Sequence, residues 1–204
     1  WCRHLDGSPL AIELAAARSN VMTPVELLAG IGQRFELLRG GRRRRSKQTL
    51  EDTLDWSYDL LDDEEQRLFR ACGVFVGSFD LDAVVAISGL SRSMALDLTE
   101  SLIAKSLIVS ERAADRARFR LLETAAAYAE QALDRLGEVQ AVRDRHLDHY
   151  VGLCLPFDIG FWPSRLALKV GVDRDNIRAA VKWAGLVGRW EDAGRIVYGA
   201  SDVL

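Results

Sequence analysis

Residues 48–75, QTLEDTLDWSYDLLDDEEQRLFRACGVF, decide how the chain is organised. Residues that can face a core recur at helical spacing in both halves: Leu50, Leu54, Ser57, Tyr58 and Leu61 in the first, and Leu68, Phe69 and Cys72 in the second. Between them, Asp62 and Glu65 have the spacing of a helix start, because the Asp62 side chain can accept from free amides of the first turn. We therefore predict two amphipathic helices that meet at an acidic corner.

The segment that follows extends this unit to about residue 136. Phe79–Ser88 predicts a third helix with Asp80 as its cap and Gly89 as its end, and Ser93–Lys105 predicts a fourth. Leu107–Val109 and the alternating Arg116–Leu121 predict two short strands joined by a polar stretch, Ser110 to Asp115. A long helix, roughly Glu123 to Leu136, would close the unit. Helices followed by a β-hairpin are the layout of a winged helix.

Two helical regions flank this unit. Residues 1–39 predict helices, and Gly40-Gly41 separates them from a basic linker, Arg42–Arg45 with Ser46 and Lys47. Residues 138–204 are again helical, and they include a pair at Asn176–Gly185 and Trp190–Tyr198 with a turn at Gly188. The expected fold class is mainly α: a helical lid (1–47), a winged-helix domain (48–136), and the start of TPR-like α-helical repeats (137–204).

The composition is that of a water-soluble globular protein. Of 204 residues, 49% are hydrophobic and 28% charged, and the net charge is −3. No apolar run approaches the roughly 20 residues that span a bilayer, and the first residues do not resemble a signal peptide. Three distant cysteines without a C-x-x-C motif suggest reduced thiols in a cytoplasm. Because the chain opens on Trp1 and stops within a helical pattern, we expect it to be a piece of a longer protein.

Four stretches, in this order, resemble a known family. They are LDGSPLAIELAAAR (5–18), TLDWSYDLLDDEEQRLFRACGVFVGSFDLDAV (53–84), FRLLETAAAYAEQAL (119–133) and DNIRAAVKWA (175–184). They resemble the lid, winged helix and first repeats of NB-ARC-type signal-transduction ATPases, the STAND class. The similarity is greatest to bacterial LuxR-type and AfsR-like regulators described as ATPases.

This resemblance implies a parent protein that binds ATP or ADP with Mg and regulates transcription. The partners it implies are the missing ATPase core of the same chain, a small-molecule or protein inducer at the helical repeats, a separate DNA-binding output domain, and a nucleotide-dependent oligomer. No membrane is implied. The chain itself has no G-x-x-x-x-G-K-[ST] loop, so we expect it to hold no cofactor and not to be an enzyme.

Two family motifs map onto this sequence by resemblance. Pro9 falls on the proline that lies near the adenine in relatives, with Gly7 and Leu10 beside it and Ser8 in place of the usual leucine. The Met-His-Asp motif, whose histidine touches phosphates in relatives, aligns with Leu121, Leu122 and Glu123. No imidazole is present there, so the resemblance does not carry direct phosphate sensing over to this point.

Whether the winged helix binds DNA is a separate question. Residues 49–136 hold 17 acidic and 9 basic residues, a balance of −8. The helix that would enter the groove, Ser93–Lys105, exposes Asp97 and Glu100 against Lys105. DNA binding needs cations that neutralise phosphates. Arg116, Arg118 and Arg120 share one predicted strand face and are candidate phosphate contacts, or else a solvated face paired with nearby acids.

Other candidate sites have simpler explanations. Arg42–Arg45 could bind phosphate, but a charge run between glycines and a serine is typical of a solvated linker. His146 and His149 are three residues apart, yet without a fixed third ligand they read as surface or packing residues, so no metal is expected. Trp56, Trp183 and Trp190 read as core or inter-helix packing. No catalytic set with a supporting motif is present.

Three hypotheses follow for function. The first is a regulatory module that couples the nucleotide state to helical sensor repeats, through a winged helix that packs on protein. The second is a DNA-binding winged-helix transcription factor. The third is a truncated remnant without activity of its own.

Overall fold

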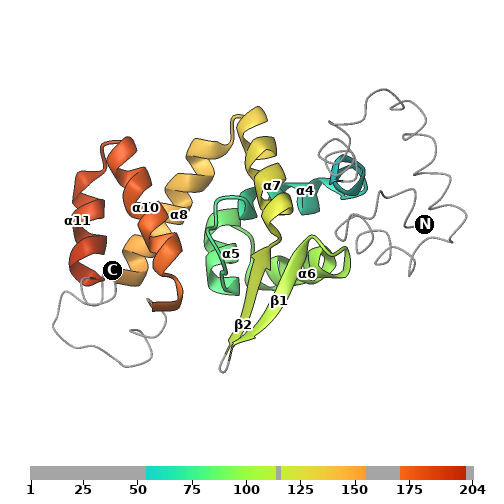
Figure 1. Cartoon of the computed structure of the whole chain (residues 1–204), viewed down its shortest axis with the longest axis horizontal. Coiled ribbons are helices and arrows are strands. Elements are labelled where there is room, and N and C mark those ends of the chain that lie inside the picture. The colour runs from blue at the N-terminus through green and yellow to red at the C-terminus, as the bar shows by residue number, and fades with distance from the viewer. Residues whose placement is uncertain (1–53, 114–115, 155–170, 201–204) are drawn as a thin grey trace, which may run out of the picture.

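The computed structural model describes residues 54–113, 116–154 and 171–200 (Figure 1). Its elements are α4 (Asp63–Cys72), α5 (Leu81–Ser88), α6 (Arg92–Ala104), β1 (Ile108–Ala113), β2 (Arg116–Leu121), α7 (Glu123–Arg135), α8 (Val139–Cys154), α10 (Arg174–Leu186) and α11 (Trp190–Gly199). Residues 54–59 are also helical. The fold is mainly α with one small antiparallel hairpin, which confirms the predicted class. The predicted lid (1–47) lies outside the described residues.

The acidic corner at the start of α4 is a complete capping box. The Asp62 carboxylate accepts from the amides of Glu64 at 3.0 Å and Glu65 at 2.9 Å, and the Glu65 carboxylate accepts from the Asp62 amide at 2.9 Å. These bonds satisfy amides that the first turn of a helix leaves open. Leu68, Phe69 and Cys72 then face the core, as their spacing predicts.

Helices α5 and α6 each begin after a residue whose side chain caps the first turn, and α5 ends at a glycine. The Asp80 carboxylate accepts from the Ala83 amide at 2.9 Å, and α5 ends at Gly89, whose φ of +72° favours glycine. Ser91 caps α6, which begins one residue earlier than predicted. The predicted third and fourth helices are thus confirmed.

The β-hairpin is longer than predicted. The antiparallel register runs from Ile108 opposite Leu121 to Ala113 opposite Arg116, so Ser110–Ala113, expected in the connecting stretch, belong to β1. Their polar character suggested a loop, but pairing with β2 satisfies their backbone groups. Phe79 adds a further pairing, because it exchanges two backbone hydrogen bonds of 2.8 Å with Phe119. The hairpin therefore lies against the residues that lead into α5.

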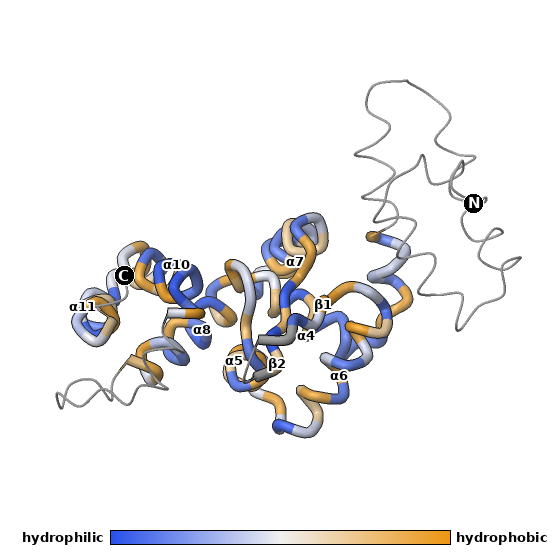
Figure 2. Tube along the Cα trace, turned by 60° about the horizontal axis from the view of Figure 1, so that its bottom comes forward, coloured by the Kyte–Doolittle hydropathy of each residue, from blue (hydrophilic) through white to orange (hydrophobic). Residues whose placement is uncertain are grey.

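Helix α8 connects the winged helix to the α10–α11 pair, which packs on its other side (Figure 1). One buried cluster joins the winged helix to the first turn of α8, and a second joins α8 to α10 and α11. Along the helices in Figure 2, hydrophobic and hydrophilic residues are interspersed, as in amphipathic helices. The predicted helix pair is confirmed, and Gly188 in its turn has a φ of +77°.

Trp190, the first residue of α11, is the exception to the predicted packing of tryptophans. Its side chain is 69% exposed, so of the two predicted roles, core or inter-helix packing, the core role was wrong. The ring lies against Gly185 near the end of α10, which fits the inter-helix role. Among the described helices, none is both long and apolar enough to cross a membrane.

Candidate functional site

The exposed face of α6 is the surface that a winged helix would present to a DNA groove. Its solvent-facing residues are Arg92, Ser93, Leu96, Asp97, Glu100 and Ala104. The Arg92 guanidinium forms an ion pair with Asp82 of α5. Asp97 and Glu100 therefore dominate the charge of this face, which confirms its predicted acidity and disfavours a phosphate backbone.

Lys105, at the end of α6, is also engaged inside the domain. Its ammonium pairs with the Glu65 carboxylate, which the Ser101 hydroxyl also reaches at 2.5 Å. Burial opposes ionisation of Glu65, but these two donors and the Asp62 amide hold its pKa below the usual value. Glu65 thus closes the capping box of α4 and fastens α4 to α6.

Arg118 of β2 lies inside the molecule. Its Nη2 donates to Asp173 Oδ1 at 2.6 Å and to the Ser78 carbonyl oxygen at 2.7 Å, and its side chain is 6% exposed. The expectation that it shares a solvated strand face with Arg116 and Arg120 was wrong. The chain just before α10 covers this side of the strand, so the guanidinium points into a contact with protein.

The other two arginines of β2 differ from Arg118, and together with β1 this strand forms the hairpin that is the wing of the winged helix. Arg120 is partly exposed and pairs with Glu111 across the hairpin, as the solvated-face interpretation predicts. The side chain of Arg116 is outside the described part. One described wing arginine, Arg120, is thus placed to reach a phosphate, and it already has an acidic partner.

The Arg118–Asp173 contact belongs to a polar junction between the winged helix and α10. Asn176 Nδ2 donates to the Ser78 carbonyl at 2.8 Å, and Asn176 Oδ1 accepts from the Val76 amide at 2.7 Å. Asp173 and Asn176 are both almost fully buried. Buried polar groups that find partners in this way define one docking geometry. Sequence reasoning missed this junction, because Asp173 and Asn176 look like ordinary residues at a helix start.

A second contact fastens the winged helix to the beginning of α8. Arg70 of α4 donates two hydrogen bonds to the Glu138 carboxylate, at 2.9 and 3.0 Å, and Nη1 donates to the Tyr58 hydroxyl. The Arg70 side chain is 7% exposed and the Glu138 side chain 39%. A bidentate Arg–carboxylate pair fixes direction as well as distance. The start of α8 is therefore set by α4.

His146 lies between the two parts as a packing residue. Its ring is 5.5 Å from that of Phe75 and 4.8 Å from that of Tyr150, and it is 3% exposed. Burial, with His149 and Arg143 nearby, lowers its pKa to about 3, so the imidazole is neutral at pH 7. Within the described ranges, no three His, Cys, Asp or Glu side chains gather as metal ligands.

The two described cysteines and the residues aligned with the Met-His-Asp motif lie within or directly beside helices and strands. Cys72 and Cys154 are buried free thiols, and burial raises the pKa of Cys154 to about 11. Leu121 is buried at the end of β2, Leu122 is the N-cap of α7, and Glu123 begins that helix and is exposed. Gly7, Pro9, Leu10 and Arg42–Arg45 lie outside the described residues, so their predicted roles stay predictions.

Comparison with known proteins identifies the central unit. Residues 61–134 match the winged helix-turn-helix domain family. The chain is 43% identical over 192 residues, 90% of its length, to a Mycobacterium tuberculosis protein named "Putative HTH-type transcriptional regulator Rv0890c", and equally to a Mycobacterium bovis protein of the same description. It is 42% identical over 154 residues, 72% of its length, to "Uncharacterized protein Rv0894" of M. tuberculosis.

These relatives are larger proteins. The chain spans about a fifth of the regulator's length and 39% of the second relative. Neither name mentions an ATPase, so the winged-helix part of the resemblance is confirmed while its nucleotide-binding part stays a prediction. Fold and comparisons agree that residues 61–134 form a winged helix-turn-helix domain, within a chain similar to a segment of mycobacterial proteins named as transcriptional regulators.

Proposed function

We propose that this chain is a non-catalytic coupling segment of a transcription regulator. In this role the winged helix holds the C-terminal helices in one orientation and passes changes in position between them and the preceding segment. A winged helix with this role uses its wing and its buried polar residues to contact protein.

The burial of Arg118 against Asp173 is the observation that carries this proposal. Because this guanidinium is buried, it cannot contact a phosphate from the wing. It binds Asp173, just before α10, instead. The acidic exposed face of α6 supports the same conclusion, because Asp97 and Glu100 would repel a phosphate backbone.

Nucleotide coupling is a finer proposal that rests on the resemblance alone. In it, ATP or ADP with Mg binds a core elsewhere in the parent protein and contacts the lid near Pro9, while an inducer acts on the C-terminal helices. The test is Pro9→Asp in the full-length parent. If the parent is an ATPase with this lid, the variant should bind ADP more weakly. Normal ADP affinity would count against the assignment of residues 1–47 as a nucleotide-contacting lid.

DNA binding by the winged helix is the second candidate function. The match to winged helix-turn-helix domains and the relatives' names favour it over nucleotide coupling. Arg120 and Arg116 in the wing would then be the phosphate contacts, in a pose that accommodates the acidic face of α6.

Binding to a fluorescent random-sequence duplex, followed by anisotropy between about 50 and 200 mM salt, separates the two functions. A DNA-binding protein that makes about six phosphate contacts loses roughly a thousandfold in affinity over that range. The coupling role predicts weak binding that changes less than about tenfold and is unaffected by Arg120→Ala. Tight binding with a steep salt dependence, lost in Arg120→Ala, would establish the DNA-binding function instead.

A further inference from the structure

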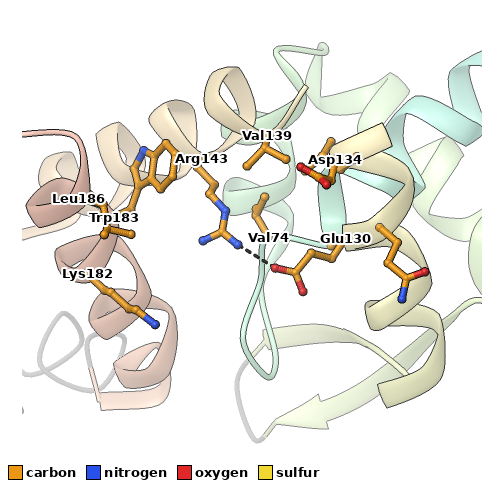
Figure 3. Close-up of a pocket in the computed structure, with 11 residues that line it drawn as sticks. Val74, Glu130, Asp134, Val139, Arg143, Lys182, Trp183 and Leu186 are labelled. Carbon is orange, nitrogen blue, oxygen red and sulfur yellow. Dashed lines mark hydrogen bonds and ion pairs between the residues drawn. The ribbon is translucent and has the colours of Figure 1, made fainter. Parts of the chain in front are cut away.

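A cleft of about 510 Å³ lies between the winged helix and the C-terminal helices (Figure 3). The end of α4 and the outer side of α7 form one wall, and α8 and α10 form the other. Its volume is within the range of small-molecule sites in proteins. Gly73 brings the α4 wall close to α7, since a Cβ there would be 2.8 Å from the Glu130 amide nitrogen.

The cleft contains an aromatic surface that is held in place before any ligand binds. Trp183 Nε1 donates to Asp144 Oδ1 at 2.8 Å, and the Arg143 guanidinium lies 5.5 Å from the centre of the indole ring. Val74 and Leu186 add aliphatic surface on opposite walls. A fixed aromatic ring and aliphatic neighbours suit an apolar body.

The charges of the cleft leave one acid and one base available. Arg143 Nη2 pairs with Glu130 Oε1 at 2.8 Å across the opening, so these two largely cancel (Figure 3). Asp134 on α7 and Lys182 on α10 are both exposed, and neither forms a hydrogen bond or ion pair with another described side chain. Figure 3 shows them on opposite sides of the Arg143–Glu130 pair.

We propose that this cleft binds a short apolar peptide with free ends. Its ammonium group would lie near Asp134, its carboxylate near Lys182, and its apolar side chains against Trp183 and Leu186. A peptide of two to four residues spans roughly 7–14 Å when extended. A ligand with a single charge would form one of these two ion pairs and leave the other charge to water. The site goes beyond the proposed coupling function, and its binding can be measured whether or not that function holds.

The test is a titration of the chain with the tripeptide Leu-Leu-Phe, followed by the ¹⁵N–¹H signal of the Trp183 indole. The signal is assigned by its loss in Trp183→Phe. We expect a saturable shift of this signal. N-acetylation or C-amidation, each of which removes one charge, should weaken binding by about fivefold, the scale of one partly exposed ion pair.

Charge variants then assign each end of the peptide. Asp134→Asn should bind the free and N-acetylated peptides equally while still preferring a free carboxylate, and Lys182→Gln should show the reverse. Asp97→Asn, on the distant α6, is the matched control and should keep both preferences. Thermal unfolding checks that each variant is folded. No saturable shift, equal binding of free and capped peptides, or unchanged preferences in the two cleft variants would overturn the proposal.

Discussion

Arg118 of the wing and Asp173, just before α10, form a buried ion pair with 2.6 Å between Nη2 and Oδ1. Removing one member of such a pair leaves the other charge buried and unpaired, which costs about 3–5 kcal/mol. We therefore expect Arg118→Ala to lower the free energy of unfolding by that amount. Urea unfolding followed by circular dichroism measures it.

A double variant separates the charge from the packing. Arg118→Met with Asp173→Leu removes both charges, so it should cost less than Arg118→Ala alone. The control is Arg120→Ala, whose partly exposed pair with Glu111 should contribute less than about 1 kcal/mol. If Arg118→Ala lowered the free energy of unfolding by no more than Arg120→Ala does, the junction would contribute little to stability.

Charge reversal on α6 tests the electrostatic barrier to DNA. Asp97→Lys with Glu100→Lys replaces two exposed acids with two cations on one helix face. Because each new phosphate contact adds about 0.9 to the salt slope, affinity for a random duplex should rise, and the slope should steepen by up to about 2. Anisotropy measures both. Unchanged affinity in this variant would show that the α6 face does not decide DNA binding.

The buried His146 predicts a specific pH dependence. Its folded pKa, lowered to about 3 by burial, is below the unfolded value of about 6.5, so between these pH values the unfolded chain binds a proton that the folded chain does not. Stability should therefore fall as pH drops through this window, by up to about 1.4 kcal/mol per unit from this group.

His146→Gln removes this contribution. The variant should be less stable than the wild type near pH 7, but the difference in unfolding free energy should shrink as the pH falls towards 4. Acidic groups shared by both proteins cancel in this comparison. A difference that stays constant from pH 7 to pH 4 would show that His146 is not the titrating group.

Two glycines give opposite predictions for the same substitution. A Cβ on Gly73 would lie 2.8 Å from Glu130 N and 2.9 Å from Ala129 C, so Gly73→Ala must push α4 away from α7, at a cost of about 1–3 kcal/mol. Gly152, inside α8, has nothing within 4 Å of the added atom, so Gly152→Ala should stabilise by about 0.5–1 kcal/mol. Thermal unfolding of the two variants measures both changes in stability. If both substitutions destabilised the protein equally, the close contact at Gly73 would not be the cause.

Local features of the fold could be predicted because neighbouring residues determine them. The Asp62–Glu65 capping box and the glycine that ends α5 at Gly89 are read from the side chains at those positions. The acidity of α6 could be predicted for the same reason.

The polar junction could not be predicted, because its partners are far apart in sequence. Arg118 and Asp173 are 55 residues apart, and the alternation in β2 indicates which face is apolar but not whether the other face is covered. The exposure of Trp190 could not be predicted for a related reason. Helical spacing places its side chain on a face of α11, and tertiary contacts alone decide whether that face is covered.

Amide hydrogen exchange tests most directly whether the wing holds the C-terminal helices. If the wing holds them, the buried amides of Ile177 and Ala180 in α10 should open with a free energy close to that of Leu68 and Phe69 in α4. In Arg118→Ala, protection of α10 should fall by more than that of α4. Fast exchange of α10 in the wild type, unchanged in Arg118→Ala, would contradict the claim that the winged helix docks these helices.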